Sequence, residues 1–199
     1  MRSVVNMWRN FALNDEAGTI ICSYPEGTKQ PSIPIPYCEE TMTGFEYALA
    51  GLMIAEGYVK EGESMVKAVR DRYDGEKRNP WNEIECGSNY ARSMASFALM
   101  PIYSGFTFDM TQKHVRFAPA SGVGKYLFSV GESWGTVELG DNTCCLTVLG
   151  DPLSLNSISV SNIENVKSVT VDGRNVDFKI SNGRIVSENI MIREVLFIK

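Results

Sequence analysis

The chain has 199 residues, with 19 Lys and Arg against 24 Asp and Glu, so its net charge is −5 with the single His neutral. A chain with no basic surplus has little to exchange for phosphate counterions, which excludes a general nucleic-acid binder. Hydrophobic residues make up 44% and charged residues 22%, as in globular proteins that bury a core. This length allows one domain or two small ones.

Membranes, disulfides and metals are not expected from the composition. No apolar run reaches the length of a membrane span, and the first residues lack the apolar stretch of a signal peptide. The five cysteines are an odd number without regular spacing, which argues against a secreted disulfide framework and favours the cytoplasm. With one His and no CxxC pair, we expect no metal site and no cofactor.

The two halves of the chain differ in character. Residues 41–100 contain seven Ala and helical apolar periodicity, whereas residues 125–199 contain no Ala and 21 Val, Ile or Thr. Ala favours helices and β-branched residues favour strands. We therefore predict an α+β fold, with a helical segment over 1–105 and a β-rich module over 106–199.

The first part of the chain begins with short strands. Residues 11–25 predict two strands around a turn at 15–18, as part of a short N-terminal hairpin. The following segment, 31–36, has three prolines and predicts an extended loop.

Three helices are then expected. The first places Phe45, Leu49, Leu52 and Met53 on one face and stops at Gly57. A second, over about 60–73, is expected to bury three apolar residues and to form an antiparallel hairpin with the first. A third is expected from about Ser88 to Pro101. The residues expected to be buried on the second helix are Met65, Val66 and Val69.

Strand-like segments follow from about residue 106 to the end. Seven or eight short strands separated by turns predict a sandwich-like module. The clearest hairpin has Asp172-Gly173 at its turn, because these residue types accept the positive φ angles that a tight turn needs.

Residues 70–94 crowd charges, amides and an aromatic ring together. Acids, amides and Arg form directional hydrogen bonds with sugar hydroxyls, and an aromatic face packs on the C–H surface of a sugar. The alternative is that Glu83 or Glu85 caps the third helix and pairs with Arg92. The candidate residues are Asn79, Trp81, Asn82, Glu83, Glu85, Asn89 and Arg92.

Three further features have structural explanations. Glu39 and Glu40 suit acid–base chemistry, but acids also occupy the first turn of a helix. His114 is expected to be an exposed or hydrogen-bonded strand residue. Cys144 and Cys145 point to opposite faces of a strand, so we expect one of them in the core.

Three stretches resemble one family of enzymes: ALNDEAGTIICSYPEG, EETMTGFEYALAGLMIAEG and VKAVRDRYDGEKRNPWNEIECGSNYARSMASFAL. Together they resemble the C-terminal part of glycoside hydrolase family 116, which includes the bile-acid β-glucosidases and their microbial relatives. The resemblance covers about residues 1–135. It implies a retaining enzyme that cleaves β-linked glucose and whose catalytic domain is an (α/α)6 toroid.

The resemblance also assigns roles to residues. Retaining glycosidases use two carboxylates about 5 Å apart, and in this family both lie upstream of the matched segment, so no catalytic residue is expected in this chain. Glu83, in NPWNEIECG, and Arg92, in YAR, match positions that hydrogen-bond glucose hydroxyls. Glu40, Trp81 and Asn89 are expected to line the same site.

Two positions depart from the family pattern. Met42 stands where relatives usually have an aromatic residue, and Asn89 stands where they commonly have His. Met42 can still cover an apolar sugar face, although less rigidly than an aromatic ring.

A complete toroid needs more helices than this chain offers, so the helices are expected to expose an apolar patch. The chain is then expected to bind a carbohydrate and either a separate polypeptide with the rest of the toroid or a second copy of itself. A non-catalytic carbohydrate-binding or interaction module, or the remnant of a truncated glycosidase gene, is the alternative. A small independent hydrolase using Glu83 with Glu85, or Glu39 with Glu40, is a third reading.

Overall fold

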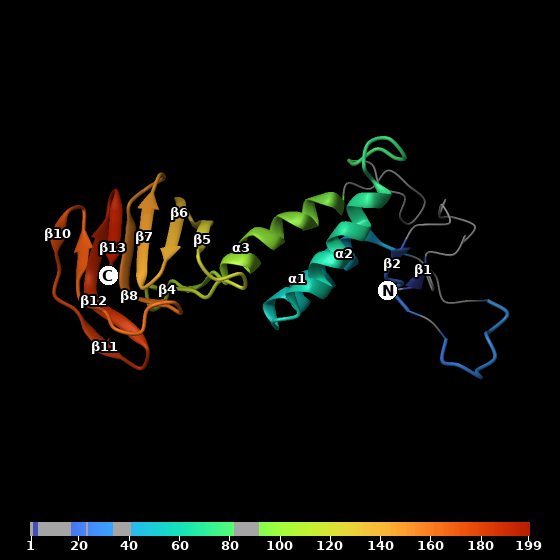
Figure 1. The fold of residues 1–199 in the computed structure, drawn as a ribbon, viewed down its shortest axis with the longest axis horizontal. Helices are drawn as coiled ribbons and strands as arrows, with labels where there is room; N and C mark the ends of the chain where they lie inside the picture. The colour runs from blue at the N-terminus through green and yellow to red at the C-terminus, as the bar shows by residue number, and fades with distance from the viewer. Residues whose placement is uncertain (1, 4–16, 23, 34–40, 82–91) are drawn as a thin grey trace. The chain divides into compact units, whose positions relative to one another are not determined.

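The computed structural model describes residues 2–3, 17–22, 24–33, 41–81 and 92–199. The chain divides into two compact units, residues 1–99 and 100–199. The first contains a helix hairpin and the second a β-sandwich (Figure 1).

A helix hairpin forms the centre of the first unit. Helix α1, Thr43–Ala55, is followed by α2, Val59–Arg72, and Gly57 with a φ of +88° lies in the link between them. The helices approach closely at Gly62, because a Cβ there would lie 2.6 Å from a side-chain carbon of Ile54. The predicted hairpin is thus confirmed, and Gly62 gives it a close crossing.

The buried faces of the two helices follow the sequence in part. On α2, Met65 and Val69 are buried as predicted, and Val66 is half-buried. On α1, the apolar residues of the predicted face lie outward, with exposures of 57% for Phe45 and for Leu52. The inward face of α1 is instead made by Glu46, Tyr47, Ala50 and Ile54.

The third predicted helix is tighter and extends further than expected. It consists of a 3-10 segment, η1, over Arg92–Ala98 and a short helix, α3, over Leu99–Ser104. Pro101 lies inside α3 because a residue in the first turn of a helix needs no intrahelical N–H partner. Ser88, the expected first residue, lies outside the described residues.

The predicted turn at residues 15–18 is wrong for its second half. Ala17–Gly18 is strand β2 and pairs with β1, Arg2–Ser3. A Cβ on Gly18 would lie 2.7 Å from Nη1 of Arg72. The absence of a side chain at Gly18 therefore lets the guanidinium of Arg72 approach the backbone closely. The turn prediction explained this glycine differently. Of the predicted extended loop, only residues 31–33 are described, and these have no regular structure.

Two antiparallel-rich sheets make up the second unit (Figure 1). One sheet has the order β10-β9-β13-β7-β6-β5 and the other β11-β12-β8-β4-β3, with β4 and β8 parallel. The strands are β3 Thr107–Asp109, β4 His114–Phe117, β5 Gly124–Val130, β6 Ser133–Gly140, β7 Thr143–Val148, β8 Leu153–Val160, β9 Val169–Val171, β10 Arg174–Asn175, β11 Lys179–Ser181, β12 Arg184–Ile192 and β13 Val195–Ile198.

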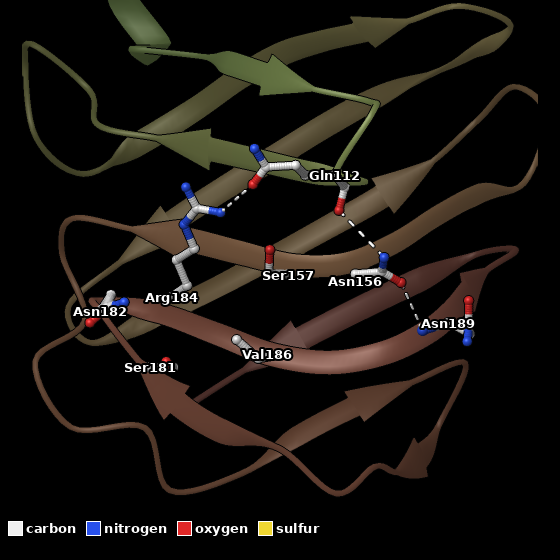
Figure 2. A pocket seen from close by; sticks show the side chains of 8 residues that line it. All are labelled: Gln112, Asn156, Ser157, Ser181, Asn182, Arg184, Val186 and Asn189. Carbon is white, nitrogen blue, oxygen red and sulfur yellow. Dashed lines mark hydrogen bonds between the residues drawn. The ribbon is translucent and has the colours of Figure 1, made fainter.

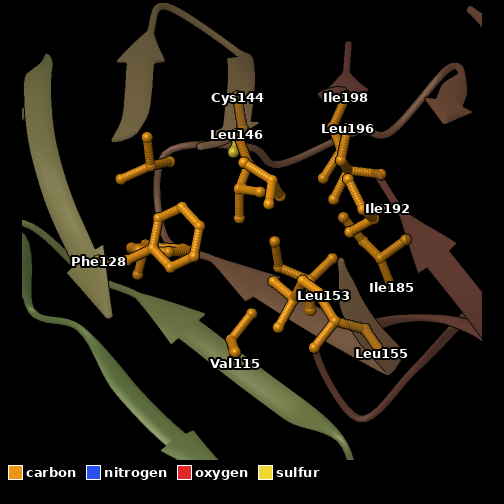
Figure 3. Packing of buried hydrophobic residues seen from close by; sticks show 14 of the residues in the cluster. Val115, Phe128, Cys144, Leu146, Leu153, Leu155, Ile185, Ile192, Leu196 and Ile198 are labelled. Carbon is orange, nitrogen blue, oxygen red and sulfur yellow. The ribbon is translucent and has the colours of Figure 1, made fainter. Parts of the chain in front are cut away.

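The core of this unit lies between the two sheets, and its side chains come from both (Figure 3). Burial alternates along β6 and β7, as expected for strands with one face inward. Leu146 of one sheet and Leu155 and Ile192 of the other are at most 1% exposed. Aliphatic side chains therefore fill much of the space between the sheets. Phe117 and Phe128 pack edge to face there, with their ring centroids 6.3 Å apart.

The hairpin predicted at Asp172-Gly173 is confirmed. The two residues have φ angles of +47° and +77° and join β9 to β10. The Asp172 carboxylate also accepts hydrogen bonds from the backbone N–H groups of Arg193, Glu194 and Val195, at 2.9 to 3.1 Å. One acidic side chain thus fastens the turn between β12 and β13.

The predicted partial (α/α)6 toroid is wrong for the part of the chain that the structure describes. Strands predominate there, and the helices are α1, α2, α3 and the 3-10 segment η1. Ala-rich composition and apolar periodicity did locate the helices, but these signals cannot show how many neighbours a helix has. The β-rich C-terminal module was predicted correctly.

Candidate functional site

The family resemblance assigns five positions as sugar contacts or site lining, and the structure describes two of them. Glu83, Asn89 and Glu40 lie outside the described residues, so their roles stay predictions. Trp81 and Arg92 are described, and both belong to the first unit. The described part of the predicted site is therefore an indole ring and a guanidinium group.

Trp81 presents its ring to solvent. It follows Asn79 and Pro80, and its backbone N–H donates to Oδ1 of Asn79 at 2.9 Å. A side-chain acceptor two residues before a backbone donor fixes a local turn. Because the residue is 76% exposed, its ring is open to an apolar face such as the C–H surface of a sugar.

Arg92 begins η1 and lies against helix α1. A Cβ on Gly44 would lie 3.0 Å from Cδ of Arg92 and 3.5 Å from its Cβ. Because glycine has no side chain, the aliphatic part of Arg92 can pack against the backbone of α1 at Gly44. Arg92 is an exposed residue although its stem rests on α1.

Met42 does not lie where the resemblance suggests. It immediately precedes α1 and is only 3% exposed. A buried side chain belongs to the core of the unit and offers no surface to a sugar. The expectation that Met42 covers a sugar face is thus corrected.

A buried ion pair, absent from the sequence analysis, connects the helices to the N-terminal segment. Nη2 of Arg72 donates to Oε2 of Glu46, and both residues are at most 5% exposed. Arg72 also donates through Nη1 to the backbone oxygen of Ala17 at 2.6 Å. Oε1 of Glu46 accepts from the backbone N–H of Thr19 at 2.8 Å. The network thus links α1, α2 and the segment that includes β2.

Burial affects the pKa of Glu46, the acid of this pair. It raises the pKa of Glu46 above the usual value, although the charge and hydrogen bonds of Arg72 act in the opposite direction. A carboxylate enclosed in this way has no open side for a substrate. One signal was available in the sequence: Glu46 shares its helical face with Ala50 and Ile54, and an acid on a buried face needs a buried cation.

Glu39, Asn82 and Glu85 lie outside the described residues, so their roles also stay predictions. His114 and the cysteine pair are described and have structural roles. His114 is 8% exposed and its Nδ1 lies 2.8 Å from Oγ of Ser157, which confirms a hydrogen-bonded strand residue. Cys144 is fully buried and Cys145 is half-buried, so one of the two lies in the core as predicted.

Two absences hold for the described part of the chain. No three His, Cys, Asp or Glu side chains there come together as metal ligands. None of the helices described is long and apolar enough to cross a membrane.

Comparisons with known proteins show no family for this chain. The described fold is a helix hairpin followed by a two-sheet sandwich. No protein-family model and no curated protein matches the sequence. Among solved structures, a β-arabinofuranosidase of glycoside hydrolase family 127 matches with a TM-score of 0.34 and 13% identity. The match covers 61% of this chain and 22% of that enzyme, so this chain spans about a fifth of its length.

Proposed function

We propose that the chain is the C-terminal portion of a β-glucosidase-type glycoside hydrolase and contributes sugar-binding residues to the cleavage of β-glycosidic bonds. The motifs RNPWNEIECG and YAR, which resemble family 116, are the basis of this proposal. The observation that carries it is the placement of Arg92 on the side-chain-free surface of Gly44. A guanidinium with a supported stem can meet hydroxyl groups in a fixed direction.

In this proposal Glu83 and Arg92 have complementary roles. A carboxylate accepts hydrogen bonds from two neighbouring hydroxyls, whereas a guanidinium only donates. The exposed ring of Trp81 supplies an apolar face for the sugar ring. The two reacting carboxylates belong to the upstream part of the enzyme.

We further propose that a separate polypeptide with the rest of the enzyme, or a second copy of the chain, covers helix α1. Phe45, Leu49 and Leu52 follow one another at helical spacing and are 57%, 38% and 57% exposed. Exposed apolar stripes of this kind are typical of surfaces that bind another protein surface. Their exposure on α1 supports the proposal that another polypeptide surface packs against this helix.

Sugar binding tests the proposed site directly. The intact chain is titrated with methyl β-D-glucoside by isothermal calorimetry or NMR, with Glu83→Gln and Arg92→Lys as variants. We expect each variant to lose about tenfold or more in affinity, equivalent to about 1.4 kcal/mol. Glu61→Gln, the same change on the exposed side of α2, is the matched control. Unchanged binding in both site variants refutes the site assignment.

A non-catalytic carbohydrate-binding module is the second candidate. Among the described residues Glu46 is the one buried carboxylate, and it is bonded to Arg72. Glu46 is therefore held by a structural ion pair and is not offered as a hydrolytic acid in this candidate. Binding of the glucoside without any hydrolysis, also in the presence of the upstream polypeptide, distinguishes this candidate.

A further inference from the structure

A polar pocket of about 630 Å³ opens on the five-stranded sheet of the sandwich (Figure 2). Seven of its eight lining side chains are polar, and Val186 is the exception. The volume lies within the range of small-molecule sites, about 300 to 1,000 Å³. All the residues that line the pocket belong to the C-terminal unit, whereas Arg92 belongs to the first unit.

Irregular strand geometry creates this pocket. The backbone N–H groups of Asn156 and Ser157 both donate to the single carbonyl oxygen of Lys113, at 2.8 and 3.3 Å. On the neighbouring strand β12 the register shifts between Val186 and Ile190, and Asn189 there has a φ of +57°. Bulges re-aim side chains and are frequent beside binding sites.

Hydrogen bonds fix the side chains around the pocket. Oδ1 of Asn156 accepts from the backbone N–H of Asn189 at 3.0 Å, and its Nδ2 donates to the backbone oxygen of Gln112 at 3.4 Å. Nη1 of Arg184 donates to Oε1 of Gln112 at 3.0 Å, as Figure 2 shows. The amide and the guanidinium are therefore oriented before any ligand arrives.

The pocket has a positive charge and spare donors. Arg184 is the one lining residue with a formal charge, and Gln112 is its hydrogen-bond partner among the described residues. A guanidinium has five N–H donors, so most remain for a ligand. The acid nearest in charge, Asp109, is bonded to the hydroxyl of Thr111 at 2.6 Å and does not line the pocket.

His114 adds no second charge. It lies beside the pocket through its contact with Ser157. Burial, together with the charge of Arg184, holds the pKa of His114 below its usual 6.5, so the ring is neutral at pH 7. The pocket therefore combines one cation with neutral amides and hydroxyls.

We propose that this pocket binds an acidic sugar, a uronic acid unit, with the carboxylate on Arg184 and the hydroxyls on the side chains of Gln112, Ser181 and Asn182. A planar guanidinium matches a carboxylate with two parallel hydrogen bonds. Amides and hydroxyls both donate and accept, as sugar hydroxyls do. Val186 provides the small apolar surface beneath the ring.

The test is an NMR titration of the intact chain with D-glucuronate, D-glucose and acetate, followed at the backbone signals of the pocket. We expect glucuronate to shift these signals in a saturable way and to bind about tenfold or more tightly than glucose or acetate. Arg184→Gln should lower the glucuronate affinity by about tenfold or more. Arg174→Gln, the same change on an exposed strand of the other sheet, should leave it unchanged.

Each contrary result has a clear meaning. Absence of saturable shifts with glucuronate overturns the proposal. Equal affinity for glucuronate and acetate would indicate an anion site without sugar recognition. Equal affinity for glucuronate and glucose would show that Arg184 does not recognise the carboxylate. Either result overturns the proposal. Glu83→Gln should not change the pocket signals, so this result is independent of the glucoside site.

Discussion

Glu46 of α1 and Arg72 of α2 form a buried ion pair whose side chains are 1% and 6% exposed. Glu46 also accepts a hydrogen bond from the backbone N–H of Thr19, and Arg72 donates one to the backbone carbonyl of Ala17. The pair thus joins both helices of the hairpin to the N-terminal segment.

Removing one partner of this pair should destabilise the helical unit strongly. Arg72→Met leaves the Glu46 carboxylate buried without its cation, which costs about 3 to 5 kcal/mol. Urea unfolding of the wild type, both single variants and the double variant with Glu46→Leu measures the coupling. The double variant should recover part of the loss. A loss below about 1 kcal/mol in Arg72→Met would contradict the assignment of the pair as structural.

The carboxylate of Asp172 should make the sandwich sensitive to acid. Partial burial opposes its ionised form, but the three backbone N–H donors of residues 193–195 lower the pKa of Asp172 below its ordinary 3.8. A lowered folded-state pKa gives stability that is present above about 3.8 and is lost as the pH falls through the folded value. Asp172→Asn tolerates the positive φ and should lack this dependence.

Thermal unfolding at pH 7 and pH 3 checks this expectation. The difference in Tm between the wild type and Asp172→Asn should be larger at pH 7 than at pH 3. Asp177→Asn, an acid outside any sheet ladder, serves as a control for the general loss of negative charge. A difference that is the same at both pH values would show that the carboxylate charge does not matter.

Gly135 should be irreplaceable in the sandwich. It lies in β6 opposite Val148, and a Cβ there would lie 1.9 Å from the carbonyl oxygen of Thr147. Gly135→Ala must displace backbone and should cost about 3 kcal/mol. Glu138→Ala, an exposed change in the same strand, should cost less than about 0.5 kcal/mol. Equal unfolding midpoints for the two variants would contradict the β6–β7 packing.

Cys144 should be inert toward thiol reagents in the folded protein. Burial raises the pKa of its thiol to about 12, and the side chain is fully buried. Only the thiolate is nucleophilic, so alkylation requires unfolding. Mass spectrometry of chains treated with iodoacetamide should find Cys144 modified in urea and unmodified in buffer. Rapid modification of Cys144 under native conditions would argue against the core packing of β7.

Local signals in the sequence predicted much of the second unit. The Asp172-Gly173 turn and the opposite faces of Cys144 and Cys145 each depend on neighbouring residues only, and each was predicted correctly. The sheet order was not predictable in this way, because the pairing of β4 with β8 is parallel and joins residues about forty positions apart. The pocket at Asn156 and Arg184 depends on that pairing and was missed for the same reason.

The helical unit shows where such signals fail. Periodicity located α1, but the large apolar residues Phe45 and Leu52 face outward while Glu46 lies inside. A helix turns its most apolar face toward whatever partner it has, and the sequence does not state which partners are present. The expectation of a partial toroid failed for a related reason, because helical periodicity does not show how helices are arranged with the other elements of the chain.

The central proposal is that this chain supplies sugar contacts to a β-glucosidase whose catalytic carboxylates lie on another polypeptide, and a hydrolysis assay tests it most directly. The purified chain is incubated with a chromogenic β-glucoside, alone and with a separately produced polypeptide that carries the upstream catalytic part of a family 116 enzyme. We predict no hydrolysis by the chain alone and hydrolysis with the partner, reduced about tenfold or more by Arg92→Lys. Hydrolysis by the chain alone, or none in either case, would contradict the claim.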